Sequence, residues 1–147
     1  MTITFLRCVI AFGLLSAATS VGAQAPVPAA LRSLKTAVLE NQVADLKALD
    51  ELAKQLRSWN HFEIVDSEGR ADVVIALAMT RLGTPGLLSV GGGVFVAAPP
   101  GAFVWSIRTV AGDKVLWIDS EKGGMFSEYG GIKNLVGRLR RRMEEKP

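Results

Sequence analysis

The spacing of apolar residues changes along the chain, and two segments show the three- and four-residue steps of an amphipathic helix. Residues 46–56 place leucines and an alanine at these steps, with acidic and basic residues between them. Residues 132–143 repeat the spacing with isoleucine, leucine, valine and methionine. Such a stripe buries one side of a helix and leaves the other side in water. We therefore expect two helices, the first capped by Asn41 or Asp45, because short polar side chains bond free backbone N–H groups.

Shorter segments rich in β-branched and aromatic residues predict strands instead. Residues 72–79 form a nearly continuous apolar run, which indicates a central strand covered on both faces. Residues 103–110 and 114–121 are separated by a short loop that contains a glycine, so they predict a hairpin. Two further strands are expected at residues 36–40 and 62–66.

The order of these elements predicts an α+β fold. It runs strand, helix, strand, strand, glycine-rich insertion, strand, strand, helix. A sheet that is apolar on one face must bury that face against another layer. We expect a two-layer sandwich with one mixed sheet of about five strands and both helices on one face. A single domain over residues 34–147 would contain these elements, with the glycine-rich hairpin inserted at residues 82–102.

The first 23 residues have the layout of a secretory signal peptide. Arg7 precedes a short apolar run, and Val21-Gly22-Ala23 fits the small-x-small pattern that signal peptidase reads. The run is shorter than the roughly 20 residues of a membrane-spanning helix, although an uncleaved anchor is the alternative. We expect cleavage near Ala23, a periplasmic or secreted location, and membrane contact only through the signal peptide before cleavage. Residues 24–33, rich in proline and alanine, are expected to form an extended tether.

Cysteine, histidine and charge limit the chemistry. The one cysteine, Cys8, lies in the signal peptide, so the mature chain can form neither a disulfide nor a thiolate metal site. The one histidine, His61, has no second histidine or cysteine with which to share a metal ion and is expected at the surface or at a cap. The net charge of +3 is small, the charges are interspersed, and this excess by itself indicates no partner. No nucleic-acid partner is expected, because the C-terminal arginines have no nearby aromatic residue except Tyr129 and the chain is expected to be exported. We expect no catalytic residue, no cofactor and no metal site.

One long segment is unusual because no charged residue occurs between Arg81 and Arg108. Its glycines and prolines disfavour a membrane helix, and the glycines at 91–93 suggest a tight reversal between two strands of a hairpin arm. These glycines fit neither a nucleotide P-loop nor a dinucleotide-binding pattern. The arm can pack over the domain's own core or present apolar residues to a partner. The residues of that possible partner surface are Leu87, Leu88, Val90, Val94, Phe95 and Val96.

Two sets of charged residues are further candidates. A basic set near the C-terminus could meet an acidic partner, or could stay solvated and complement the helix dipole. Its members are Arg138, Arg140, Arg141 and Arg142. An acidic set could converge as the carboxylate pair of a hydrolase or sugar-binding cleft near Tyr129, although solvated carboxylates are ordinary at strand ends. Its members are Asp66, Asp72, Asp119, Glu121 and Glu128.

Several strand motifs resemble a family of small secreted bacterial proteins of unknown function. The resemblance spans most of the mature chain, and the segments that carry it are Phe62 to Asp66, Ala71 to Ile75, Val115 to Asp119 and the closing helix from Lys133 to Arg142. The element order is also similar to periplasmic domains of the curli-secretion lipoprotein, the activators of penicillin-binding proteins and the Tol-system N-terminal domain. This resemblance implies protein–protein binding in the envelope. The chain departs from the two kinds of lipoprotein because it lacks their acylated cysteine.

The leading hypothesis is therefore a non-enzymatic envelope module. It would bind another envelope protein or a second copy of itself through a sheet edge or through the uncharged arm. The alternative is a periplasmic hydrolase or sugar-binding protein that uses the surface carboxylates. A deep pocket with paired carboxylates would favour this alternative.

Overall fold

A computed structural model describes residues 27–43, 45–80, 86–89, 95–111, 114–122 and 129–145. The expected signal peptide, residues 1–23, and its cleavage site lie outside these ranges. None of the helices in the described ranges has the length and apolar character needed to span a membrane.

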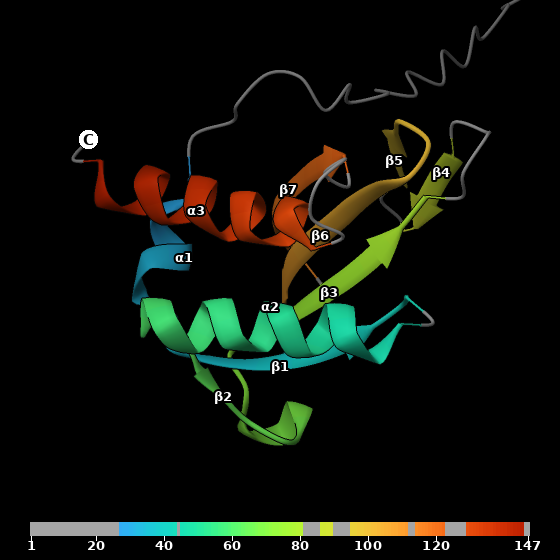
Figure 1. The fold of residues 1–147 in the computed structure, drawn as a ribbon. Coiled ribbons are helices and arrows are strands. Elements are labelled where there is room, and N and C mark those ends of the chain that lie inside the picture. The colour runs from blue at the N-terminus through green and yellow to red at the C-terminus, as the bar shows by residue number, and fades with distance from the viewer. Residues whose placement is uncertain are drawn as a thin grey trace, which may run out of the picture.

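The fold is an α+β sandwich with one mixed sheet, as the sequence predicted (Figure 1). Five strands lie in the order β2-β1-β3-β6-β7. Strand β1 runs parallel to β2 and β3, whereas the β3–β6 and β6–β7 pairs are antiparallel. The strands are β1 (Thr36–Asn41), β2 (Glu63–Ile64), β3 (Val73–Met79), β6 (Ala102–Thr109) and β7 (Val115–Lys122). Helices α2 (Leu46–Trp59) and α3 (Gly130–Glu144) cover one face of this sheet.

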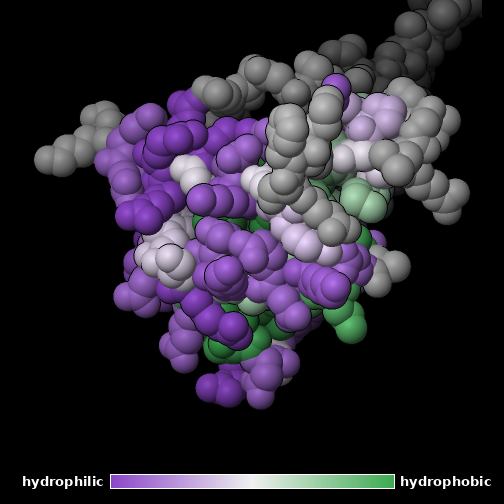
Figure 2. All heavy atoms as spheres, viewed as in Figure 1, coloured by the Kyte–Doolittle hydropathy of each residue, from purple (hydrophilic) through white to green (hydrophobic). Residues whose placement is uncertain are grey.

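The central position of β3 in the sheet explains why its sequence is apolar at successive positions. Side chains alternate between the two faces of a strand, and Val73, Ile75 and Leu77 belong to the core beneath the helices. The intervening Val74 and Ala76 point to the other face and are also buried. Because both faces exclude water, the strand shows no alternation of polar and apolar residues. The exposed sides of the two helices are mostly hydrophilic (Figure 2), as their amphipathic patterns require.

Short polar side chains determine where α2 begins and ends. The Asp45 carboxylate accepts a hydrogen bond from the backbone N–H of Lys47 at 2.9 Å, so Asp45 is the cap. Asn41 instead accepts one from the N–H of Val43, also at 2.9 Å, and turns the chain after β1. At the other end Asn60 takes the left-handed conformation with φ 58°, which asparagine tolerates, and stops the helix.

Residues 29–33 correct the prediction of an extended tether over residues 24–33. They form a short helix, α1 (Ala29–Ser33), whose Leu31 is fully buried in the core. The Arg32 guanidinium donates hydrogen bonds to the carbonyls of Met143 at 2.8 Å, Arg142 at 3.3 Å and Glu145 at 3.0 Å. The last carbonyls of a helix lack hydrogen-bond donors within the helix, and Arg32 donates to these carbonyls at the end of α3. Composition alone could not show that these residues meet that helix end.

The second strand is shorter than predicted, while the hairpin is close to its predicted position. Residues 62–66 were expected as a strand, but β2 has only two residues because Phe62 is buried in the core and the chain turns at η1 (Glu68–Arg70). Strands β6 and β7 pair as expected, with an irregularity between Ile107 and Arg108.

Candidate functional site

The uncharged arm contains a second, two-stranded sheet. Strands β4 (Gly86–Ser89) and β5 (Phe95–Ala98) pair antiparallel, with Leu88 opposite Val96, as the predicted hairpin requires. Of the possible partner surface, Val90 and Val94 lie outside the described residues. Val96 is buried, so it does not belong to an exposed face.

An apolar cluster, called here the arm cluster, joins the arm to the helix-free face of the main sheet. Its buried members are Val96, Ala98, Ala102 and Val104, and its half-buried rim is Val115 and Ile118 of β7. Val104 alternates along β6 with Phe103 and Trp105, which face the helices, so the cluster lies on the opposite face. In the described part of the arm, packing over the domain's own core is therefore observed.

The junction between arm and sheet is held by one buried hydroxyl group. Thr80 donates to the carbonyl of Pro99 and accepts a hydrogen bond from the N–H of Ala102 at 2.9 Å. Pro100 and Gly101, with φ 69° at Gly101, form the turn that leads into β6. A positive φ after proline is the type II pattern, which favours glycine at that position.

The four arginines do not form a free basic patch. The Arg138 guanidinium is held by the carboxylates of Asp119, at 2.8 Å, and Glu121, and by the carbonyl of Ser120 at 2.8 Å. Burial opposes the charge of Arg138, but the two carboxylates outweigh it and raise its pKa. Arg140 makes an exposed ion pair with Glu144, and the half-buried Arg142 pairs with Glu145 at the same helix end. Arg141 is exposed.

Of the candidate carboxylates that the structure describes, it brings Asp119 and Glu121 together and places Asp66 and Asp72 elsewhere. Asp119 and Glu121 lie on one face of β7, where the Arg138 side chain bridges them. Asp66 is exposed beside Arg70. The Asp72 carboxylate accepts hydrogen bonds from the backbone N–H groups of two residues at the start of β1, which lowers its pKa. Glu128 lies outside the described residues, and Tyr129 donates to the cap Asp45 at 2.7 Å.

The edges of the main sheet are unequal. At one edge β2 is two residues long, whereas at the other β7 is eight residues long. Within the described ranges β7 pairs with β6 alone. An edge strand carries a row of N–H and C=O groups that another strand can pair with. The β7 edge is therefore the longer template, with the rim of the arm cluster on one face and the paired Asp119 and Glu121 on the other.

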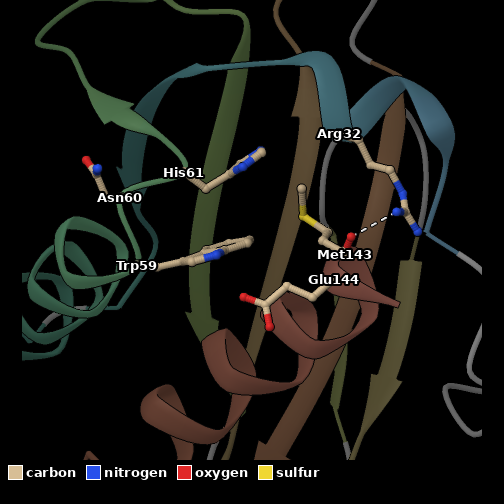
Figure 3. Close-up of a pocket in the computed structure, with 6 residues that line it drawn as sticks. All are labelled: Arg32, Trp59, Asn60, His61, Met143 and Glu144. Atoms are coloured by element: carbon tan, nitrogen blue, oxygen red, sulfur yellow. Dashed lines mark hydrogen bonds between the residues drawn. The ribbon is translucent and has the colours of Figure 1, made fainter. Parts of the chain in front are cut away.

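A cavity of about 310 Å³ lies where the C-terminal ends of α2 and α3 meet α1 (Figure 3). Its lining combines aromatic, sulfur and charged side chains. These are Arg32, Trp59, Asn60, His61, Met143 and Glu144. Sequence reasoning missed this site because its residues come from three segments that are far apart in the chain, and only His61 had drawn attention.

The aromatic residues at the cavity pack against one another. The rings of Trp59 and His61 stack with centroids 5.0 Å apart and an angle of 21° between their planes. Phe62 meets both rings edge-on. Burial, followed by the charge of Lys35, lowers the pKa of His61 below its usual value, so the imidazole is neutral at pH 7. Its Nε2 atom is buried and makes no hydrogen bond of ordinary geometry.

No protein family matches the sequence, and no curated protein matches it either. Several solved structures are similar to this chain at low identity. One is a dodecameric variant of PelC from Paraburkholderia phytofirmans, with TM-score 0.45 and 15% identity over 79% of this chain and 90% of that chain. Another is uncharacterized lipoprotein B from Nitrosomonas europaea, with TM-score 0.38 and 11% identity over 74% and 81%. A third is a minor lipoprotein from Acinetobacter baumannii, with TM-score 0.37 and 13% identity over 75% and 90%. At these values the likenesses assign no function.

Proposed function

We propose that this chain is an exported envelope protein that binds an extended segment of another protein at the edge of β7. The observation that carries the proposal is the eight-residue length of this edge, against two residues at the opposite edge. In strand addition, main-chain hydrogen bonds provide affinity and the flanking side chains provide specificity. The signal-peptide layout of residues 1–23 supports export.

The helix-free side of β7 suits an added strand. Val115 and Ile118 are half-buried at the rim of the arm cluster, so an apolar residue of the added strand would extend that cluster. Cross-strand apolar pairs of this kind stabilise a sheet by about 0.2–1 kcal/mol each. The arm serves as the scaffold that fixes this rim, through Val96 and Ala98.

The face of β7 that points toward the helices also allows a strand to be added. Unpaired charges that point inward are a common protection against edge pairing. Here Arg138 holds the carboxylates of Asp119 and Glu121, so their negative charge is largely compensated. An extended peptide can therefore approach without meeting two free carboxylates.

Photo-cross-linking in intact cells tests the proposal. A photoreactive residue is placed in turn at Ile118, Ser120 and Lys122 of β7, at Leu88 of the arm, and at Glu63 on the β2 edge as the matched control. Strand addition predicts adducts from the three β7 positions to every second residue of one partner segment, in one antiparallel or parallel register, because side chains on one face of paired strands recur with period two. Glu63 should give none.

A blocking variant makes the test decisive. Ile118→Lys adds a charge at the rim of the arm cluster and should abolish the adduct from Lys122, whereas Glu63→Lys should leave it unchanged. Folding of both variants is checked by circular dichroism. Adducts that come only from Leu88, or an Ile118→Lys variant that still cross-links normally, would refute binding at the β7 edge.

A further inference from the structure

The cavity at the ends of α2 and α3 combines donor atoms that suit a metal ion, although the sequence pointed to none. No group of three His, Cys, Asp or Glu side chains in the described ranges is placed to hold a metal. The cavity instead offers one imidazole and one thioether, from His61 and Met143 (Figure 3). Thioether sulfur and imidazole nitrogen are soft or borderline ligands, which favour Cu(I) over hard cations such as Mg²⁺.

The imidazole is prepared to act as a ligand. A metal binds the neutral ring, and burial keeps His61 neutral. The backbone carbonyls of Leu31 and Leu34 act on the ring and oppose part of the lowering of its pKa, whereas Nε2 is buried without a hydrogen bond. A ligating histidine usually turns its second N–H toward a carbonyl or carboxylate, so carbonyls beside the ring suit a ligating imidazole.

Met143 and Trp59 complete the soft surroundings. Figure 3 shows the thioether of Met143 and the rings of His61 and Trp59 projecting toward the same space. Met143 is only 9% exposed, so its sulfur is held in position by packing. An indole face attracts a cation through its quadrupole, which adds to the attraction without requiring a bond.

The charged side chains around the cavity allow a monovalent cation to bind there. The Arg32 guanidinium is turned onto the carbonyls at the end of α3, where it offsets the negative end of that helix dipole. The Glu144 carboxylate pairs with Arg140 at 2.9 Å, but the two side chains are 60% and 53% exposed, and exposed ion pairs are weak. Glu144 can therefore turn to a cation in the cavity and offset the nearby Lys35.

We propose that this cavity binds one soft monovalent metal ion, of the Cu(I) and Ag(I) class, through the His61 imidazole and the Met143 thioether. Trp59 lies against the ion, and Glu144 supplies negative charge. This site is independent of the β7 edge, since its residues come from α1, α2, α3 and the segment that precedes β2.

Titration with silver nitrate, in chloride-free buffer, tests the site. The exported form is used without a histidine tag, after mass spectrometry of its N-terminus, so that His61 is the one histidine and, if cleavage occurs as expected, thiols are absent. We expect one Ag(I) per chain by calorimetry, a shifted His61 ring-nitrogen resonance in ¹⁵N NMR, and quenched Trp59 emission that is lost in Trp59→Phe.

Matched variants separate this site from adventitious binding. Met143→Leu and His61→Phe, which keep the apolar volume and the ring stack, should each raise the Kd for Ag(I) at least about tenfold. Met79→Leu removes a more exposed methionine elsewhere and should leave the Kd unchanged. Equal binding by Met143→Leu and the unchanged protein, no His61 shift, or equally tight binding of Zn(II) would each overturn the proposal. Thermal unfolding confirms that each variant folds.

Discussion

Gly131 and Gly137 lie six residues apart in α3, and the same substitution by alanine should change stability in opposite directions. A Cβ at Gly131 would lie 2.9 Å from the backbone oxygen of Lys122 and 3.3 Å from the ring of Phe103. A Cβ at Gly137 would meet no atom within 4 Å. Gly131 is thus the point where the start of α3 packs directly on β7, while Gly137 leaves unused space.

The magnitudes follow from these contacts. Alanine in a helix interior is favoured over glycine by roughly 0.5–1 kcal/mol, because the unfolded chain loses less freedom, so Gly137→Ala should stabilise by that amount. At Gly131 the same gain is smaller, since the residue is at the helix start, and overpacking costs about 1–3 kcal/mol. The contact is with a strand backbone that cannot rotate away. We therefore expect Gly131→Ala to destabilise the protein by about 1–2 kcal/mol.

Urea unfolding, followed by circular dichroism at constant temperature, measures both effects in one series. The double variant should show the sum of the two changes, because the sites are about 9 Å apart along the helix and share no contact. A Gly131→Ala protein as stable as the unchanged protein would refute the reasoning, since it would mean that α3 and β7 separate without cost. An unchanged or lower stability of Gly137→Ala would show that the open space around it is not available to a methyl group.

Three further changes test other contacts of the fold by the same urea measurement. Asp72→Ala should destabilise at about pH 7 and have progressively less effect as the pH falls below 3.8. Hydrogen bonds from two backbone N–H groups lower the folded pKa of Asp72, so its contribution to stability is full above the unfolded pKa and is lost as the pH falls through the folded pKa. A difference between the two proteins that does not shrink as the pH falls would contradict this. Arg32→Met should cost about 1–2 kcal/mol, because three carbonyls at the end of α3 lose their donor, and an unaffected midpoint would show that water replaces it fully. Thr80→Val should cost about 1–3 kcal/mol by leaving the buried junction of the arm without its hydroxyl, whereas Thr80→Ser should retain most of the stability.

Local patterns were sufficient for the elements whose environment is uniform along their length. The leucine spacing of α2 and the apolar run of β3 identified a one-faced helix and a strand buried on both sides, because each residue's neighbours lie within a few positions or repeat regularly. The element order then implied one sheet with helices on a single face, since few layer arrangements bury these stripes. The uncharged arm was likewise expected as a hairpin from its glycines.

Tertiary structure decided every feature that depends on contacts between distant residues. Whether α1 forms depends on Arg32 meeting the end of α3, 110 and more positions away. Whether the arginines form a patch depends on Asp119 and Glu121 lying opposite Arg138. Which strands lie at the edges depends on the strand order, and the cavity exists because the ends of two helices and α1 come together around His61 and Met143. Sequence periodicity reports how a segment is buried, but the identity of the covering residues is set by the packing of the whole chain.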